Sequence, residues 1–184
     1  MPILNKNHTY GLVSILFHWL MAIILLVTFV LGLNLEHNFQ YYYEVLMLHN
    51  SLGILIFFLA IFRACWKWFN IRPEPLSSKK IFIRLATVIH ISFYVLFFLL
   101  PITGYLLTNL QGDTVSFFGS YLPNILEKNF QFKQYAHNIH EILGKIILGM
   151  VVLHIIGALY HHYWLKDNTL KRILFFNKIK SNQE

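Results

Sequence analysis

The last apolar segment of the chain carries two histidines whose spacing suits chemistry at two depths. His140 and His154 lie 14 residues apart in a stretch made almost entirely of Ile, Leu, Val, Gly and Met. In an α-helix this spacing leaves the two rings ~40° apart around the axis and ~21 Å apart along it. A buried imidazole needs a hydrogen-bond or metal partner. One face of this helix is therefore expected to present a ligand at each of two levels.

Two earlier apolar segments each offer a histidine at a matching level. His18 lies near the start of the first segment and His49 near the start of the second. If the segments cross a membrane alternately, His49 meets His140 and His18 meets His154. Neutral imidazole is a common iron ligand, and a haem macrocycle is well buried among Leu, Phe and Val. The spacing therefore predicts two haems, each held by two histidines, and leaves His90 as a competitor at the inner level.

Other uses of these histidines fit the pattern less well. A structural zinc site takes four ligands, whereas each level offers two. A proton relay would usually include Asp or Glu, and the apolar spans have none beyond Glu141 at the border of the last one. Hydrogen bonding between helices without any haem stays open as an alternative.

Glycines and one arginine accompany the histidines. Gly53, Gly144 and Gly157 each follow a histidine by three or four residues, which suits either the approach of a flat ring or ordinary close helix packing. Arg63 follows His49 by 14 residues and so shares its face at the inner level. It suits either a bidentate pair with haem propionates or a lipid-headgroup anchor.

Four apolar segments must position these residues. The chain has 184 residues, of which 57% are hydrophobic and only 12% charged, and its mean hydropathy is +0.54. Windows near the ~20-residue length that crosses a bilayer predict helices at about 12–33, 46–69, 84–107 and 140–164. The predicted fold class is an all-α membrane protein, a single domain over 1–184 in which a four-helix bundle encloses two b-type haems.

The net charge of +7 is informative once the basic residues are mapped onto these spans. They cluster before the first span, between the second and third, and after the fourth, whereas the two opposite loops hold only Lys128 and Lys133. By the positive-inside bias, both termini and the second loop are cytoplasmic. The excess charge therefore reflects topology and contact with anionic lipids, and nucleic-acid binding is not expected. The residues of the three clusters are Lys6, Arg63, Lys67, Arg72, Lys79, Lys80, Arg84, Lys166, Lys171, Arg172, Lys178 and Lys180.

Several remaining features limit the class of protein. The first span exceeds the ~7–15 apolar residues of a signal peptide and no Ala-x-Ala site follows it, so cleavage is not expected. The lone Cys65 excludes an intramolecular disulfide, and the absence of C-x-x-C-H excludes covalently attached c-type haem.

Two further features concern local structure. Pro101 and Gly104 are expected to kink the outer half of the third span. The aromatic outer segment 109–135 is expected to cap the bundle at the membrane interface.

Taken together, these residues resemble the bacterial four-helix cytochrome b561 family, whose studied enterobacterial member is a superoxide oxidase. The resemblance covers nearly the whole chain. It rests on His-Trp-Leu at 18–20, Leu-His-Asn-Ser-Leu-Gly at 48–53 with Arg63, His90, and Leu-Pro-Ile-Thr-Gly at 100–104. Its most specific part runs from His-Glu at 140–141 through His154 to His-His-Tyr-Trp-Leu-Lys-Asp-Asn-Thr-Leu at 161–170.

The resemblance implies specific roles. His18 and His154 would bind the cytoplasmic-side haem b, and His49 and His140 the outer one, which decides against His90. His161 matches the position associated with a quinone site; a histidine hydrogen-bonded to lipid headgroups is the alternative reading. In the superoxide oxidase, superoxide becomes O2 at the outer face and ubiquinone becomes ubiquinol at the inner side.

The chain also departs from the family. Many members carry Arg and Gln where this sequence has Leu12 and Ser14, so if those groups line the quinone pocket, its details differ here or its quinone binding is weaker. The outer loops are not basic, so attraction of an anion such as superoxide depends on the local placement of Lys128 or Lys133.

The expected function follows from these features. We expect a di-haem cytochrome b of the bacterial inner membrane, an oxidoreductase that couples an outer-face donor, superoxide or a redox partner, to ubiquinone among membrane lipids. Imidazole pairs keep iron six-coordinate and favour electron transfer over oxygen binding. One alternative is a haem-b anchor subunit of a hydrogenase-type or formate dehydrogenase-type complex, and another is a haem-free transporter or scaffold.

Overall fold

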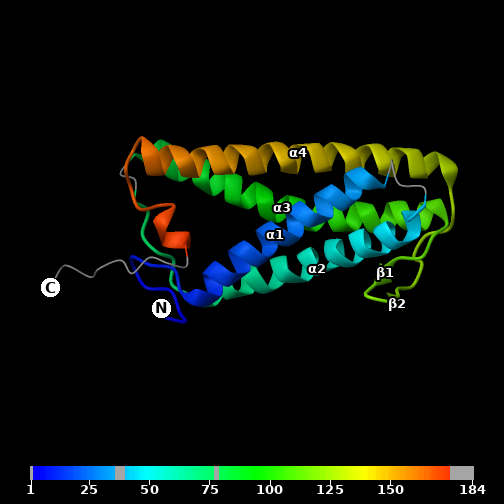
Figure 1. Cartoon of the computed structure of the whole chain (residues 1–184), viewed down its shortest axis with the longest axis horizontal. Coiled ribbons are helices and arrows are strands. Elements are labelled where there is room, and N and C mark those ends of the chain that lie inside the picture. Colours follow the sequence, from blue (N-terminus) through cyan, green and yellow to red (C-terminus); the bar gives the residue numbers. More distant parts are fainter. Residues whose placement is uncertain (1, 36–39, 77–78, 175–184) are drawn as a thin grey trace.

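Four long helices make up most of the protein. The structure is a computed structural model that describes residues 2–35, 40–76 and 79–174; Lys178 and Lys180 of the last basic cluster lie outside these ranges. The helices are α1 (Leu12–Asn34), α2 (Tyr42–Phe69), α3 (Lys80–Gln111) and α4 (Phe130–Tyr163) (Figure 1). Each is long and apolar enough to cross a membrane. The predicted four-helix membrane fold is confirmed.

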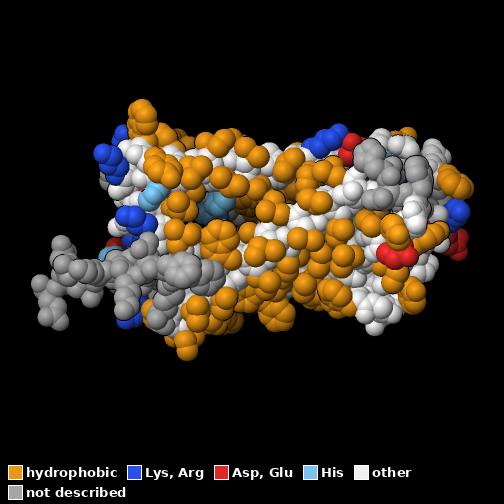
Figure 2. Space-filling view, in the orientation of Figure 1, with side chains coloured by type: hydrophobic (Ala, Val, Ile, Leu, Met, Phe, Trp, Pro, Cys, Tyr) orange, Lys and Arg blue, Asp and Glu red, His pale blue; other side chains and the backbone are white. Residues whose placement is uncertain are grey.

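The helices pack in chain order, α1 against α2, α2 against α3 and α3 against α4. Their shared core is built from apolar side chains of all four. On the outer faces, side chains such as Ile23, Val30, Leu153 and Ile156 are more than half exposed. Figure 2 shows this apolar cover over the middle of the molecule, with charged side chains gathered toward the two ends. Such a surface suits lipid contact. The core residues are Met21, Ile24, Ile56, Ala60, Leu96, Phe97 and Ile147.

We call the end of the bundle where α1 begins and α4 finishes the terminal end, and the opposite one the loop end. The segments before α1 and after α4 both lie at the terminal end (Figure 1). There the Asn5 side chain accepts hydrogen bonds from Gly11 N and Ser14 Oγ and donates to Ile71 O. After α4 a short 3-10 helix, η1 (Lys171–Ile173), folds back and accepts a hydrogen bond from Trp19 Nε1 at Ile173 O. The terminal end is thus tied together by residues far apart in the sequence.

The helices extend further at the loop end than the sequence predicted. α4 begins at Phe130, not near His140, because the Asn129 side chain caps it by accepting from Gln131 N and Phe132 N. α3 continues through Pro101 and ends at Gly112, whose φ of 97° is the left-handed conformation that glycine adopts readily.

The remaining loop-end cap, 112–129, is smaller than expected but held firmly. It contains a hairpin of β1 (Ser116–Phe117) and β2 (Ser120–Tyr121). Ser51 of α2 donates to Ser116 O and accepts from Phe118 N. Asn109, which is 1% exposed, donates to Asn124 and accepts from Ile125 N. The cap therefore closes over the loop ends of α2 and α3.

Candidate functional site

At the loop end, the rings of His49 on α2 and His140 on α4 have their centres 6.1 Å apart and their planes 77° apart. Metal–imidazole bonds are about 2.0–2.1 Å long, and a ring centre lies about 1.1 Å from its nitrogen. Two imidazoles on opposite sides of one metal ion therefore have centres ~6.3 Å apart. The separation of the two rings would suit two imidazoles that bind one metal ion.

Hydrogen bonds fix which nitrogen each of these rings presents. His49 Nδ1 lies 2.9 Å from the Thr28 carbonyl, which can only accept. His140 Nδ1 lies 3.0 Å from Thr103 Oγ1, whose own proton is directed to the backbone carbonyls of Leu99 and Leu100. Both rings thus carry their proton on Nδ1, and Nε2 is left as a metal-binding atom.

Two glycines allow the rings to take these positions. A Cβ at Gly32 would lie 3.0 Å from His49 Cε1, and one at Gly104 would lie 3.1 Å from His140 Cε1. A larger residue would displace each ring. At Gly53, Gly144 and Gly157, a Cβ would meet no atom of another described residue within 4 Å, so close helix packing does not explain these three glycines. That arrangement fits the approach of a flat ring.

At the terminal end, the His18 ring on α1 lies 6.2 Å from the His154 ring on α4. His90 on α3 lies 5.9 Å from the same ring, so distance does not separate the two pairings. The packing of the helices differs between the two pairings. α3 packs directly along α4, and a macrocycle between His90 and His154 would have to part these helices, whereas α1 and α4 share few contacts among the described residues. Figure 2 shows histidine atoms in a hollow near this end.

Arg63 lies beside the terminal-end pair. Its guanidinium is 3.4 Å from His18 Nδ1 and 3.9 Å from Met21 Sδ. Across residues 2–35, 40–76 and 79–174, no carboxylate lies within 4.0 Å of it. A half-buried cation in such surroundings fits a carboxylate-bearing group such as a haem.

No zinc-type centre forms within the part of the chain that the structure describes. There, no group of three or more His, Cys, Asp or Glu side chains comes together to hold a metal ion.

The other histidines of α4 lie apart from these pairs. His161 packs on the Phe82 ring, 5.7 Å between centres, and its Nδ1 lies 2.6 Å from Asp167 Oδ2. His162 Nδ1 is buried without a hydrogen-bond partner among the described residues. His137 is half-buried one turn before His140.

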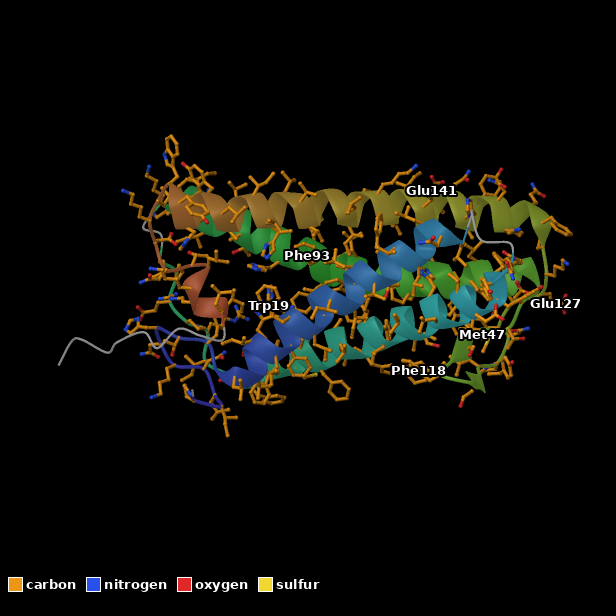
Figure 3. All side chains as sticks on the ribbon, viewed as in Figure 1. Trp19, Met47, Phe93, Phe118, Glu127 and Glu141 are labelled. Carbon is orange, nitrogen blue, oxygen red and sulfur yellow. The ribbon has the colours of Figure 1, made fainter. Side chains whose placement is uncertain are left out.

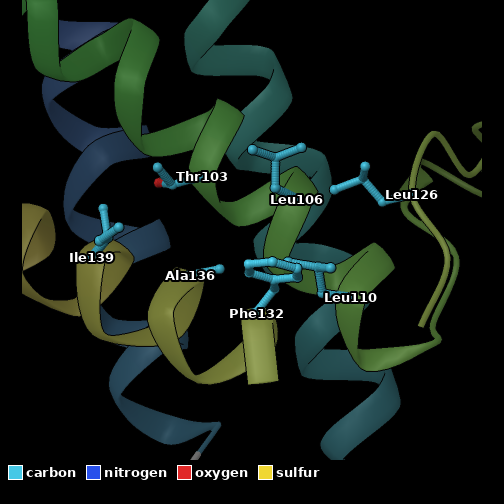
Figure 4. A pocket seen from close by; sticks show the side chains of 7 residues that line it. All are labelled: Thr103, Leu106, Leu110, Leu126, Phe132, Ala136 and Ile139. Atoms are coloured by element: carbon cyan, nitrogen blue, oxygen red, sulfur yellow. The ribbon is translucent and has the colours of Figure 1, made fainter. Parts of the chain in front are cut away.

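A separate groove lies beside the loop-end pair, between α3 and α4. It has a volume of about 340 Å³, and Thr103 is the residue of its lining that carries a hydroxyl (Figure 4). An acyl chain fits such a lining, whereas an anion would be poorly solvated there. The lining residues are Thr103, Leu106, Leu110, Leu126, Phe132, Ala136 and Ile139.

Comparison with known proteins identifies the family of the chain. The family model of prokaryotic cytochrome b561 matches residues 9–176. The chain belongs to this family. It is 35% identical over 179 residues to "Cytochrome b561 homolog 2" of Escherichia coli K12, covering 95% of each chain. It is 30% identical over 168 residues to "Probable superoxide oxidase CybB" of Yersinia pestis, covering 90% of this chain and 95% of that one.

The family establishes the general character of the protein. It is a multi-pass bacterial membrane protein of electron transport, and b-type haem is its cofactor. The residues present fit that group, because two pairs of imidazoles could bind haem iron and the Arg63 guanidinium beside one pair could bind a propionate.

Several contacts of the site carry no signal in the sequence. Thr28, Thr103 and Gly32 lie on other helices than the histidines they touch, so no periodicity points to them. Ser14, a departure from the family pattern, accepts from Trp66 Nε1 and donates to Asn5. Ser14 therefore links α1 to α2 and to the segment before α1 through hydrogen bonds.

Proposed function

We propose that the protein holds two b haems by bis-histidine ligation and carries electrons across the bilayer to ubiquinone. His49 and His140 would hold the haem at the loop end, and His18 and His154 the haem at the terminal end. The observation that carries this proposal is the pair of ring separations, 6.1 and 6.2 Å, at two levels of one bundle.

The two haem sites would lie at different depths in the membrane, so that electrons pass from one to the other. Bound haem supplies one-electron redox chemistry, while the protein supplies ligands, a low dielectric and fixed spacing. His140 and His154 sit ~21 Å apart along α4, so the two levels lie in different halves of a ~30 Å hydrocarbon core. Arg63 would pair with the propionates of the terminal-end group.

The proposed topology places the terminal end in the cytoplasm and the loop end outside, in the inner membrane. The basic residues at the terminal end, such as Lys79, Lys80 and Arg84, support this orientation. Quinone reduction would then take place at the cytoplasmic side near His161.

Superoxide is the proposed outer donor. The name of the Yersinia pestis relative supports it, and the apolar groove of Figure 4 does not suit an anion, so the approach would be over the loop-end cap. Lys128 is the candidate for local attraction there. It packs along Gly112 and lies over the Phe130 ring at 5.0 Å.

The test uses the purified, haem-loaded protein. We expect two haems per chain, a b-type spectrum, and quinol formation when superoxide and a short-chain ubiquinone are added. A ratio of one haem or none would reject the bis-histidine pairs. Two haems with no quinone reduction from superoxide would retain the ligands and reject the proposed donor and acceptor.

A further inference from the structure

A short, largely buried side-chain contact joins His161 to Asp167. His161 Nδ1 and Asp167 Oδ2 are 2.6 Å apart, and the two side chains are only 20% and 19% exposed. Asp167 N donates back to His161 O at 3.1 Å, and Thr169 N donates to Asp167 Oδ1 at 2.8 Å. Each of the two carboxylate oxygens of Asp167 therefore has a hydrogen-bond partner.

The chain makes a costly turn to build this contact. Lys166, just before Asp167, has a φ of 54°, a left-handed conformation that is unfavourable for a residue with a side chain. This turn reverses the chain after α4 and brings Asp167 back to the last turn of the helix. Strain of this kind, held by surrounding hydrogen bonds, is often found at functional positions.

His161 faces the same way as His154. The two residues are seven apart, which places them ~20° apart around α4 and ~10 Å apart along it. A molecule at His161 is therefore close to the terminal-end pair. The Phe82 ring beside His161 adds a flat apolar wall, which suits a quinone ring.

We infer that Asp167 is a positioning residue that holds His161 with Nδ1 occupied, so that Nε2 passes protons to the quinone. The inference rests on the proposed function. The carboxylate can only accept, so the shared proton sits on His161 Nδ1 and protons enter and leave through Nε2.

The proposed step is balanced in atoms and electrons. Two superoxide ions are oxidised to two O2, and the two electrons released reduce one ubiquinone. The quinone takes up two protons to form ubiquinol. Each proton would leave Nε2 of protonated His161 for a quinone oxygen, and water on the cytoplasmic side would return a proton to Nε2. Asp167 stays ionised throughout and keeps the ring oriented.

The charge state of Asp167 agrees with this role. Burial alone would raise the pKa of its carboxyl, but hydrogen bonds from His161 and Thr169 outweigh burial and hold the pKa below its ordinary value. A second pair of a histidine and a carboxylate lies at the same end, but it is exposed and so differs from the His161–Asp167 pair. His8 and Glu74 are 3.8 Å apart with side chains 74% and 67% exposed, so Glu74→Gln is a matched control.

The experiment starts from pre-reduced haems without oxygen and follows their reoxidation by two acceptors in rapid mixing. Ubiquinone needs protons, whereas ferricyanide takes one electron and no proton. For Asp167→Asn we expect reoxidation by ubiquinone to slow about ten- to a hundredfold, with the quinone KM nearly unchanged. Ferricyanide reoxidation and haem content should stay as in the parent protein, and Glu74→Gln should leave all of these values unchanged.

Two results would overturn the inference. In one, Asp167→Asn reoxidises at the parent rate with ubiquinone. In the other, reoxidation of Asp167→Asn slows equally with ubiquinone and with ferricyanide, which would show that the contact supports the fold and not proton transfer. If the parent protein itself is not reoxidised by ubiquinone, the proposed function fails instead, so the two failures are distinguishable.

Discussion

Replacing Gly104 by alanine tests whether His140 binds a haem from the position seen in the structure. The new Cβ would lie 3.1 Å from His140 Cε1. Carbon atoms pack at about 3.5–4.0 Å, so the ring must move by at least ~0.4 Å. Metal sites tolerate displacements of about 0.2 Å. The same movement would stretch the 3.0 Å contact between His140 Nδ1 and Thr103 Oγ1.

The expected result of Gly104→Ala is the selective loss of the loop-end haem. Disturbing a contact that orients a ligand costs about ten- to a hundredfold in metal affinity, so the ratio of haem to protein should fall from two toward one. The measurement is haem content by alkaline pyridine spectroscopy together with a redox titration, in which one of two steps should weaken. Gly32→Ala should act alike, since its Cβ would lie 3.0 Å from His49 Cε1.

Gly149→Ala is the matched control on α4. A Cβ there meets no atom of another described residue within 4 Å, and Gly149 lies ~180° around the helix from His140, so both haems should be kept. Alanine is favoured over glycine in a helix by about 1 kcal/mol, so helix propensity cannot explain a loss at Gly104. If Gly104→Ala kept two haems with unchanged midpoint potentials, the reasoning that places His140 as a ligand against this glycine would be refuted.

Three further perturbations test other parts of the structure. His154→Ala should lose the terminal-end haem while His90→Ala retains both; the opposite result in the haem ratio would reverse the pairing. Arg63→Gln should lower the midpoint potential of the terminal-end haem by about 60 mV, equivalent to 1.4 kcal/mol for one electron, because a nearby cation favours the reduced form; an unchanged titration would contradict the proximity. Asp167 has a lowered pKa, so its stabilising effect is present above the ordinary value of 3.8 and is lost as pH falls through the lower folded value. The melting-temperature difference between the parent and Asp167→Asn should therefore shrink below that pH.

The C-terminal segment shows how the tertiary structure adds to the sequence pattern. Figure 3 labels Trp19 on α1, and its indole donates to Ile173 O of η1. Arg172 Nη1 donates to Glu74 O in the link between α2 and α3. These contacts hold the segment containing Asp167 near α1, although 154 residues separate Trp19 from Ile173.

By itself the sequence determined the membrane class, the four helices and the place of each histidine along its own helix. Long apolar windows and the 3.6-residue period of a helix are local properties, so they can be read without a fold. The spacing of His140 and His154 along one helix is therefore enough to indicate two levels. The helix ends were less predictable, since α4 begins at Phe130 through a cap made by the Asn129 side chain.

Only the tertiary structure decided which groups touch these histidines. His18 and His90 both lie beside His154, and α3 packs directly along α4; spacing along the chain carries no such information. Thr103 and Gly104 act on His140 from a different helix. Asp167 reaches His161 only because the chain reverses at Lys166. Periodicity gives the depth and face of a residue on its own helix, whereas contacts between helices depend on how the helices pack.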